Sequence, residues 1–385
     1  MRCYQSMIEF KNVSQGYNGK TVLTGISLTI QTGEFVVLIG SSGCGKTTLL
    51  KTINKLNPLE KGDILIDGVS IKSIPNNKLR RSIGYVIQDG GLFPHMTVGE
   101  NIALLLKTVG TEVSKIPERI DELLEMVNLD PDTYRDNFPI QLSGGQKQRV
   151  GVARAFAADP DIILMDEPFS ALDPVTRSEL QNEIVKLQKQ FGKTIVFVTH
   201  DMDEAIKMAD RICIIQNGKI AQFNSPEEIL KHPANTYVEE FIGKNRLWGN
   251  PAYIKAADIM KKGAIRISKD RTVLQALQIM KHHVIDSLLV TSGKNLKLEG
   301  IVWLENLQEF QNYSSSLDDF ISTDYTFVYE DTSLQEIIDT IDYNISGIIP
   351  VINHQKELQG YLTKSSLLLI LSKRYRKDNE DLLEE

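Results

Sequence analysis

The sequence has few cysteines, no long apolar run and no excess of positive charge. Its three cysteines, at positions 3, 44 and 213, have unrelated spacings, which indicates neither a disulfide framework nor a zinc site. No apolar run approaches the roughly 18–20 residues needed to span a bilayer, and the start MRCYQSMIEF lacks the apolar core of a signal peptide. A net charge of −7 argues against nucleic-acid binding, which usually needs a basic stripe. We therefore expect no nucleic-acid partner, a cytosolic compartment, and any role at a membrane to depend on a partner.

The chain of 385 residues is long enough for two or three domains, each with a full core. FVVLIG (35–40), DIILMD (161–166) and TIVFVTH (194–200) are short apolar runs typical of buried parallel strands. Helical patterns such as residues 47–56 alternate with them. This order predicts an α/β core with a mostly parallel sheet, interrupted by a helical subdomain at about residues 89–158.

Two hairpins and a connecting helix are also predicted. ILIDGVSI (64–71) has a hairpin pattern, and CIIQNGKIAQF (213–223) contains an Asn-Gly turn between two strands. YVEEFIGKNRLWGN (237–250) is predicted to be a linker. The first domain is therefore expected to cover residues 7–236.

The rest of the chain contains an internal duplication. TVLQAL (272–277) recurs as TSLQEI (332–337), and GIVWLENL (300–307) recurs as GYLTKSSL (360–367). The two pairs have the same spacing in the sequence. A repeat at a constant spacing predicts two copies of one structural unit, each with a helix, two short strands and a helix.

A third pair, Asp258 and Asp319, has a spacing that is greater by a single position. The three concordant spacings place the predicted copies at residues 251–310 and 314–373, as a pseudo-symmetric pair. Two unrelated α/β segments with similar turns are the alternative.

A glycine-rich segment follows the first buried strand. Residues 40–47, GSSGCGKT, fit the pattern G-x-x-x-x-G-K-[ST] between a predicted strand and a predicted helix. Glycines let successive backbone N–H groups turn inward around an anion, and the helix N-terminus adds its dipole. Lys46 would reach the β- and γ-phosphates of a nucleotide, and the Thr47 hydroxyl would ligate magnesium. The alternative is a Gly/Ser turn without a ligand.

DIILMDEP (161–168) is the expected complement of this loop. Its apolar residues carry a strand to the sheet edge, where Asp166 would join the magnesium shell and Glu167 would face the γ-phosphate. Carboxylates that end a buried strand usually belong to a site, because their burial without a partner is costly.

LSGGQ (142–146) lies before a basic helical segment. Ser143 and the N–H groups of Gly144 and Gly145 would cap a helix and form a second anion site; a cap without a ligand is the alternative. Together with the phosphate loop, LSGGQ resembles the ATPase subunit of ABC transporters, of which it is the signature motif. The resemblance implies a head-to-tail homodimer in which each signature closes over the ATP held by the other chain.

Other positions match the family residue by residue. The resemblance implies that Tyr17 stacks on adenine and that Gln88 senses magnesium and the γ-phosphate while moving with the membrane partner. Asp173 would link the two sites across the dimer. His200 would contact the γ-phosphate and orient the water that Glu167 polarises.

The implied cofactors are ATP and Mg²⁺. The predicted catalytic residues are Glu167, His200, Lys46 and Gln88. The predicted metal ligands are Thr47, Gln88 and Asp166. The predicted nucleotide-binding residues are Tyr17, Gly40, Ser41, Ser42, Gly43, Cys44, Gly45, Lys46, Thr47, Thr48, Gln88, Ser143, Gly144, Gly145, Gln146, Asp166, Asp173 and His200.

Other charged and histidine residues are expected to have no special role. Lys147 and Arg149 are predicted to be solvated helix positions. His95, His282 and His283 are predicted to be ordinary loop or helix-surface histidines.

The duplicated region resembles a tandem CBS pair, a module that often binds adenine nucleotides. Its adenosine pattern is glycine, an apolar residue, any residue, Ser or Thr, two more residues and Asp. In the first copy this pattern starts at Gly300 and has Trp303 in place of the hydroxyl residue. In the second copy it starts at Gly360, keeps Thr363 and has Ser366 in place of the acid. These departures argue against AMP or ATP binding there. A cyclic dinucleotide at a CBS dimer interface, no ligand, or a dimerisation role remain open.

One nucleotide-binding domain followed by two CBS repeats resembles the ATPases of osmoprotectant importers, from about residue 7 to 373. The resemblance implies an importer of glycine betaine, carnitine, choline or proline betaine, with two permease subunits, an extracytoplasmic substrate-binding protein and a place on the cytoplasmic face of the membrane. An importer for another solute, a non-transport ABC ATPase and a nucleotide sensor are the alternatives. Residues 1–6 would be an extension or an upstream start. The charged tail 374–385 is predicted to be disordered, and a salt-responsive contact of that tail is a hypothesis.

Overall fold

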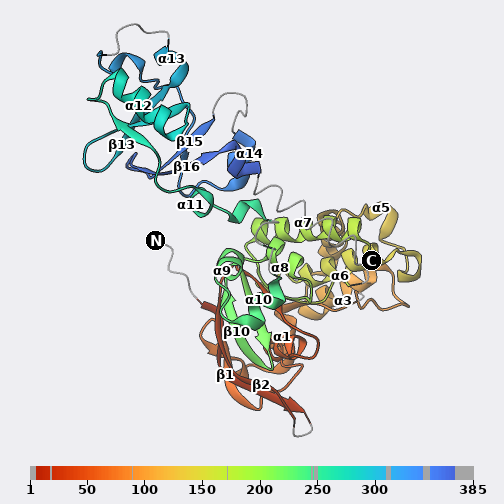
Figure 1. Ribbon diagram of the computed structural model, residues 1–385. Coiled ribbons are helices and arrows are strands. Elements are labelled where there is room, and N and C mark those ends of the chain that lie inside the picture. The colour runs from red at the N-terminus through yellow and green to blue at the C-terminus, as the bar shows by residue number, and fades with distance from the viewer. Residues whose placement is uncertain are drawn as a thin grey trace, which may run out of the picture. The chain divides into compact units, whose positions relative to one another are not determined.

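The computed structural model describes residues 6–17, 20–88, 90–170, 172–243, 246, 250–308, 314–340 and 347–368. The chain forms two compact units, residues 1–242 and 243–385 (Figure 1). The predicted tail lies outside the described residues, and the predicted linker 237–250 lies partly outside them.

The first unit contains an antiparallel sheet that the sequence did not predict. Its order is β2-β1-β4-β5. The strands are β1 (Ser6–Tyr17), β2 (Lys20–Gln31), β4 (Lys61–Ile66) and β5 (Val69–Ser70). The predicted hairpin at 64–71 is confirmed.

The second sheet of this unit is the predicted α/β sheet. Its order is β10-β9-β3-β8-β7-β6, and only the β9–β10 pair is antiparallel. The strands are β3 (Phe35–Ile39), β6 (Ile83–Val86), β7 (Ile162–Asp166), β8 (Thr194–Val198), β9 (Arg211–Gln216) and β10 (Lys219–Asn224). Every residue of β3, β7 and β8 is buried, as their continuous apolar sequences predict.

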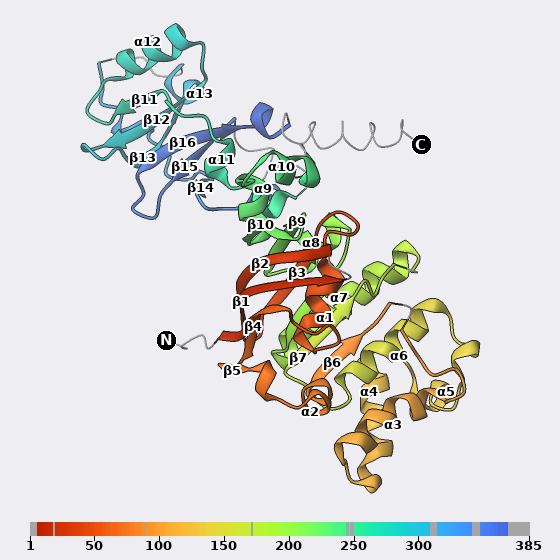
Figure 2. The same ribbon diagram turned by 90° about the horizontal axis from the view of Figure 1, so that it is seen from below.

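Helix α1 (Lys46–Ile53) packs with both sheets in one core (Figure 2). Its Leu49, Leu50 and Ile53 are fully buried. The other helices of the α/β region are α2 (Asn76–Arg81), α7 (Pro174–Phe191), α8 (Met202–Met208), α9 (Pro226–Lys231) and α10 (Thr236–Ile242). The phosphate loop thus runs from a strand buried on both faces into a helix anchored by its apolar side.

Between β6 and β7 the described chain forms helices joined by turns and loops, without a strand. They are α3 (Val98–Val109), α4 (Ile116–Met126), α5 (Pro131–Tyr134) and α6 (Gly144–Phe156). Figure 2 shows them gathered beside the sheets, with α6 nearest to β6. This arrangement matches the expected helical insertion and carries the signature segment on it.

The second unit has two three-stranded sheets of the same design. One has the order β11-β12-β13 and the other β14-β15-β16, each with a parallel pair followed by an antiparallel pair. The strands are β11 (Arg266–Ser268), β12 (Ser287–Ser292), β13 (Lys297–Trp303), β14 (Val328–Tyr329), β15 (Ile348–Ile352) and β16 (Leu358–Thr363). Each copy has a short first strand that the sequence pattern did not predict.

This unit contains the helices α11 (Ala256–Ile259), α12 (Val273–His283), α13 (Leu304–Gln308) and α14 (Leu334–Thr340), and residues 364–368 are also helical. Ile254 and Ala256, at the start of the first copy, lie in the core of the second. Leu317, at the start of the second copy, lies in the core of the first. Each copy therefore completes the core of the other.

The duplication is confirmed, but the pairing of TVLQAL with TSLQEI is wrong by a single position. The Thr272 hydroxyl accepts a hydrogen bond from the amide of Gln275 at the start of α12. Ser333 does the same for Glu336 at the start of α14. The residue equivalent to Thr272 is therefore Ser333 and not Thr332, so the matching letters of the two segments are out of register.

The hairpin between the second and third strands accounts for the change of spacing. Val290 pairs with Gly300 in the first copy, and Val351 pairs with Gly360 in the second. The first hairpin is therefore one residue longer. Equivalent positions of the two copies are therefore one residue farther apart in the sequence before this hairpin than after it.

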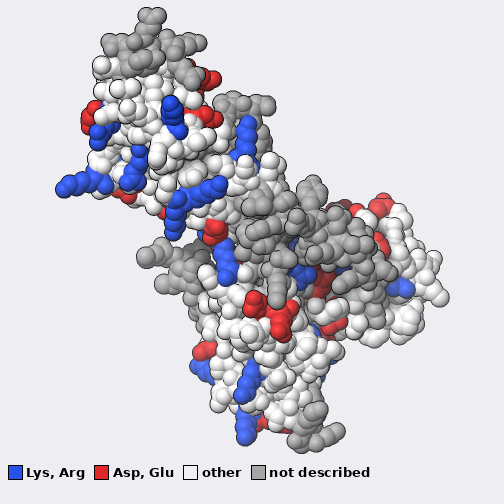
Figure 3. All heavy atoms as spheres, in the orientation of Figure 1, with Lys and Arg blue, Asp and Glu red and all other residues white. Residues whose placement is uncertain are grey.

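No helix of the described residues is long and apolar enough to cross a membrane. Figure 3 shows Lys and Arg side chains interspersed with Asp and Glu on the visible face.

Candidate functional site

The phosphate loop between β3 and α1 is shaped by close backbone contacts. A Cβ on Gly40 would lie 2.3 Å from the Ile215 carbonyl oxygen, so only glycine fits there. Gly45, at the N-cap of α1, has a φ of 107°, a conformation that other residues rarely adopt. A Cβ on Gly43 would meet nothing within 4 Å, so the loop is open at that point.

Lys46 reaches back across this loop. Its Nζ donates to the carbonyl oxygens of Gly40, at 2.9 Å, and Ser41, at 3.3 Å. The residue is only 6% exposed. Ser41, Ser42 and Gly43 are exposed, whereas Cys44 and Gly45 are buried. A buried ammonium thus sits under an open loop whose helix N-terminus favours an anion.

Thr47 and Asp166 meet although they are far apart in the sequence. The Thr47 hydroxyl donates to Asp166 Oδ1 at 2.7 Å, and Lys51 Nζ lies 3.3 Å from Asp166 Oδ2. Burial raises the pKa of the Tyr85 phenol, and the Asp166 carboxylate raises it further. The sequence predicted the meeting of Thr47 with Asp166 but missed Lys51 and Tyr85. Lys51 follows Thr47 by four residues on α1, which places both on one helix face.

Glu167 and His200 lie together at the ends of neighbouring strands. Glu167 Oε2 is 3.5 Å from His200 Nδ1. The Glu167 amide donates to the Val198 carbonyl at 3.0 Å, and its φ of 45° is unusual for a residue other than glycine. The His200 side chain is 67% exposed and that of Glu167 is 28% exposed. A carboxylate and an imidazole therefore flank the same accessible edge.

Gln88 and Asp173 lie on loops beside this edge. Gln88 Nε2 donates to the Ser170 hydroxyl at 3.3 Å. Asp173 caps α7, and its Oδ1 accepts hydrogen bonds from the amides of Val175 and Thr176 at 3.1 Å. Hydrogen bonds from the side chain and backbone of Thr176 lower the pKa of the Asp173 carboxyl.

The signature segment forms the predicted helix cap. Ser143 Oγ accepts from the Gln146 amide at 3.3 Å, and Gln146 Oε1 accepts from the Ser143 amide at 2.8 Å. A Cβ on Gly145 would lie 2.5 Å from Thr176 Cγ2, so Gly145 allows α6 to approach α7. Ser143 and Gly144 are exposed. No hydrogen bond joins the described residues 142–146 to the phosphate loop of the same chain.

Arg149 is not the solvated residue that the sequence suggested. It is 9% exposed, donates to the Val127 carbonyl at 2.9 Å and pairs with Glu183 of α7. The prediction was wrong because α7 packs over this face of α6 and supplies the counter-charge. Lys147 is half-buried.

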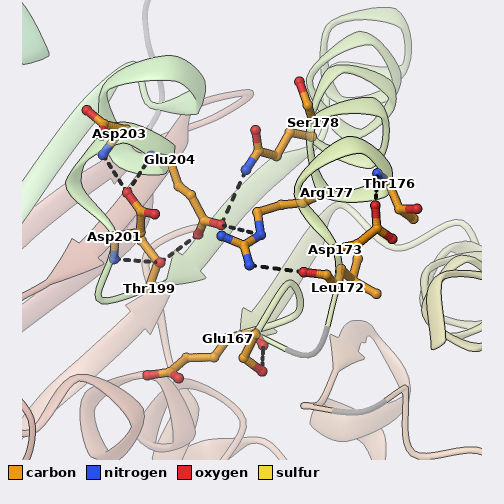
Figure 4. A network of polar contacts seen from close by, with 12 residues as sticks. Glu167, Leu172, Asp173, Thr176, Arg177, Ser178, Thr199, Asp201, Asp203 and Glu204 are labelled. Carbon is orange, nitrogen blue, oxygen red and sulfur yellow. Dashed lines mark hydrogen bonds and ion pairs between the residues drawn. The ribbon is translucent and has the colours of Figure 1, made fainter. Parts of the chain in front are cut away.

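A buried polar network that includes Thr199, the residue before His200, was also missed by the sequence analysis (Figure 4). Thr199, Glu204 and Gln181 are 3%, 7% and 5% exposed. Thr199 Oγ1 donates to Glu204 Oε2 at 2.6 Å, and Arg177 Nη2 donates to the Leu172 carbonyl at 3.0 Å. These residues carry no motif that marks them; only the tertiary structure brings them together.

Two further residues, Tyr17 and Thr48, were predicted to bind the nucleotide. Tyr17 is the last residue of β1, and its side chain lies outside the described part of the chain. Thr48 is half-buried in the first turn of α1.

The hydroxyl groups of the CBS adenosine pattern form hydrogen bonds with nearby backbone groups. Thr363 Oγ1 accepts from the Ser366 amide at 3.2 Å, and Ser366 Oγ accepts from the Thr363 amide at 2.9 Å, so they cap the helical residues 364–368. In the first copy Trp303 ends β13, and its side chain packs at the contact between the two sheets. Neither copy presents a free hydroxyl and an acid together.

The comparisons with known proteins agree with this geometry. The ABC transporter family matches residues 23–170, and the CBS domain family matches residues 256–302 and 317–373. In fold, the chain is similar to the ATP-binding cassette MJ0796 in a dimeric post-hydrolysis state bound to ADP and Pi. That likeness has a TM-score of 0.53 and 35% identity, and covers 57% of this chain and 99% of that one.

Two curated relatives extend the likeness over nearly the whole chain. The carnitine transport ATP-binding protein OpuCA of Listeria monocytogenes serotype 1/2a (strain 10403S) is 46% identical, covering 95% of this chain and 92% of its own. The glycine betaine/carnitine/choline transport ATP-binding protein OpuCA of Bacillus subtilis (strain 168) is 45% identical, covering 98% and 99%. The chain therefore belongs to the family of ATP-binding subunits of osmoprotectant ABC transporters, which are ATPases coupled to transport, and it carries two CBS domains.

Proposed function

We propose that this chain drives the import of quaternary ammonium osmoprotectants such as glycine betaine, carnitine, choline and proline betaine. The observation that most supports the ATP-hydrolysing part of this proposal is the convergence of Thr47 with Asp166, and of Glu167 with His200, at one edge of the six-stranded sheet. The names of the relatives support the solute class.

ATP and Mg²⁺ fit the residues at this edge. The buried Lys46 ammonium and the open loop at Gly43 suit a polyphosphate, and the Thr47–Asp166 pair offers two oxygen ligands to a hard cation. Residues 40–48 would hold the phosphates, and Gln88 would complete the metal ligands. Mg²⁺, when bound, neutralises charge on the transferred phosphoryl group. Tyr17 would stack on adenine.

Glu167 is the proposed general base. It would accept the proton of the attacking water, while His200 orients that water and contacts the γ-phosphate. The hydrogen bond of the Glu167 amide to Val198 fixes the backbone at the strand end. A fixed carboxylate beside an exposed imidazole supports in-line attack from this edge.

Two copies of the chain are proposed to pack head to tail. Ser143, Gly144, Gly145 and Gln146 of one copy would close over the nucleotide of the other, and Asp173 would link the two sites. The exposed Ser143 cap and the absence of hydrogen bonds from the described signature to its own phosphate loop support this arrangement. The solved dimer of MJ0796 supports it as well.

Two permease subunits and an extracytoplasmic substrate-binding protein would complete the importer. The chain would then lie on the cytoplasmic face of the membrane as a peripheral subunit, with Gln88 on the loop that moves with the permease.

The CBS pair is proposed to be the regulatory module, with a cyclic dinucleotide as its ligand at the contact of two modules. Trp303 and the mutual bonds of Thr363 and Ser366 argue against a simple adenosine site. Equilibrium binding of a labelled cyclic dinucleotide and of labelled AMP to the full chain tests this assignment, which fails if the cyclic dinucleotide does not bind.

Glu167→Gln tests the catalytic proposal. The change removes the proton acceptor but keeps the side-chain size, so ATP turnover should fall about 100- to 1000-fold while an ATP-bound dimer accumulates on size-exclusion chromatography. Glu118→Gln, on the exposed first turn of α4, is the matched control. Unchanged turnover in Glu167→Gln would refute the role.

Uptake of labelled glycine betaine at low and high external salt tests the solute. Parent cells should import it and cells with Glu167→Gln should not. Equal uptake in both strains contradicts the osmoprotectant proposal and leaves the ATPase chemistry standing.

A further inference from the structure

Two segments of the proposed ATP site are joined through the buried network between α7 and α8 (Figure 4). One is the His200 segment, residues 199–201, and the other is the Asp173 loop, residues 172–173. We propose that Glu204 and Arg177 are positioning residues that couple these segments, so that each nucleotide site senses the state of the other. This inference rests on the proposed dimer, in which His200 faces the chain's own ATP and Asp173 faces the partner's.

Glu204 holds the His200 segment through Thr199. Thr199 Oγ1 donates to Glu204 Oε2 at 2.6 Å and accepts from the Asp201 amide at 3.0 Å. The carboxylate therefore fixes the backbone on both sides of His200 without touching the imidazole. Asp201, and not Glu204, caps α8, because Asp201 Oδ1 accepts from the amides of Asp203 and Glu204. The contact of Glu204 with Thr199 is thus additional to what the helix itself needs.

Arg177 holds the Asp173 loop. Its Nη2 donates to the Leu172 carbonyl at 3.0 Å, one residue before Asp173. Asp173 is then fixed from the other side by the Val175 and Thr176 amides. A shift of Arg177 would therefore move the residue that is proposed to reach the second site.

The contacts that hold the His200 segment and those that hold the Asp173 loop meet at Glu204 Oε1. Gln181 Nε2 donates to this oxygen at 3.3 Å, and Arg177 Nε lies 4.0 Å from it. A charge-assisted hydrogen bond is about 2.8 Å long, so a small displacement of either segment would change this contact strongly. Glu204 is 7% exposed, and burial raises the pKa of its carboxyl. The Arg177 side chain is 32% exposed, so solvent screens this contact in part, but its Glu204 end lies in the protein interior, where a charge contact can transmit a movement.

Glu204→Gln and Arg177→Gln in the purified full chain test the coupling. Both remove the charge pair, whereas glutamine at 204 can still accept the Thr199 hydrogen bond. We expect kcat for ATP to fall about tenfold with little change in KM, and the Hill coefficient for ATP to fall from above one to about one. The double variant should lose no more than either single one, because the two residues act as a unit.

Lys207→Gln is the matched control. Lys207 donates to Gln181 Oε1 and to Ser178 Oγ, both at 3.0 Å, so it belongs to the same cluster but contacts neither loop. We expect it to keep the parent kcat and Hill coefficient. A purely structural role for the network would instead lower the melting temperature of all three single variants alike and leave cooperativity intact.

The outcomes separate this inference from the proposed function. A parent chain that hydrolyses no ATP contradicts the proposed function itself. A parent that hydrolyses ATP with a Hill coefficient of one, or variants that keep the parent's cooperativity, overturns the coupling alone. Additive losses in the double variant also overturn it.

Discussion

The nucleotide site of the first unit and the CBS pattern of the second use the same residue types in opposite ways. In the first unit the Thr47 hydroxyl meets Asp166, which lies 119 residues away in the sequence. In the second unit the hydroxyls of Thr363 and Ser366 bond to backbone groups three residues away. Polar groups from remote segments converge at a ligand site, whereas polar groups that bond locally mainly shape a helix end.

One glycine of the phosphate loop, Gly43, differs in the same sense from the glycines of the CBS pattern. Gly43 leaves open space at the phosphate loop. A Cβ on Gly300 would lie 2.5 Å from the Ser322 carbonyl oxygen, and one on Gly360 would lie 2.7 Å from that of Lys261. In the second unit the other copy's backbone occupies the space beside each glycine. A glycine in a recognised pattern can therefore admit either a ligand or another part of the chain.

The largest effect is expected from breaking the contact between Thr47 and Asp166 in the first unit. Asp166→Asn removes the charge that meets Thr47 and Lys51, so ATP turnover should fall about 100- to 1000-fold. Steady-state ATPase assays over a range of Mg²⁺ concentrations measure it. Asp161→Asn, at the exposed residue before β7, is the control. Full activity in Asp166→Asn would place the metal elsewhere.

Ligand binding should separate the two units. ATP with Mg²⁺ at about 100 times its Kd should stabilise the first unit by about 2.7 kcal/mol. AMP should leave the protection of residues 300–306 and 360–366 unchanged, because no free hydroxyl–acid pair is present there. Hydrogen exchange with each nucleotide measures both effects. Protection of the CBS segments by AMP would contradict the distinction drawn between the two sites.

A smaller effect is expected from filling the contact between the CBS copies. Gly360→Ala would bring a Cβ within 2.8 Å of Met260 Sδ and closer still to Lys261, so the second unit should lose about 2 kcal/mol of unfolding free energy. Gly347→Ala is the control, since its Cβ would meet only Asp286 at 3.8 Å. Denaturant-dependent hydrogen exchange of residues 347–368 measures the loss. Equal stability of both variants would show that the copies separate easily.

The smallest effect is expected from removing the Ser366 hydroxyl, which helps to cap the helical residues 364–368. Ser366→Ala removes the hydroxyl that bonds to the Thr363 backbone, so the free energy of unfolding of the second unit should fall by about 1 kcal/mol without any change in ATP turnover. Ser365→Ala, at an exposed neighbouring position, serves as the reference. An altered turnover in Ser366→Ala would instead indicate that this hydroxyl has a regulatory ligand.

Local and periodic features could be predicted from the sequence. The apolar runs of β3, β7 and β8 predicted buried strands because both faces of each are covered. The Asn-Gly turn predicted the β9–β10 hairpin, where Asn217 and Gly218 have φ angles of 48° and 73°. The phosphate loop was predictable because its chemistry depends on a short segment of backbone.

The features that the sequence left undetermined depend on contacts between distant segments. The antiparallel sheet, the burial of Arg149 against Glu183 and the network of Glu204 with Arg177 have no local pattern. The predicted register of the helix in the second CBS copy was wrong by one position. Identical residues were matched, but the hairpins of the two copies differ in length by one residue.

The sequence by itself determined the buried strands β3, β7 and β8, the helix cap at Ser143 and the residue types at the nucleotide site, since backbone preference and apolar periodicity act over a few residues. Tertiary structure decided the direct contacts at the site, including the ion pair of Lys51 with Asp166 that the sequence did not indicate. Thr47 and Asp166 become partners because α1 starts and β7 ends at the same edge of one sheet, and Thr363 and Ser366 cap only their own helix. A bond between distant residues exists only when packing holds both ends in place, and that packing is a property of the folded chain as a whole.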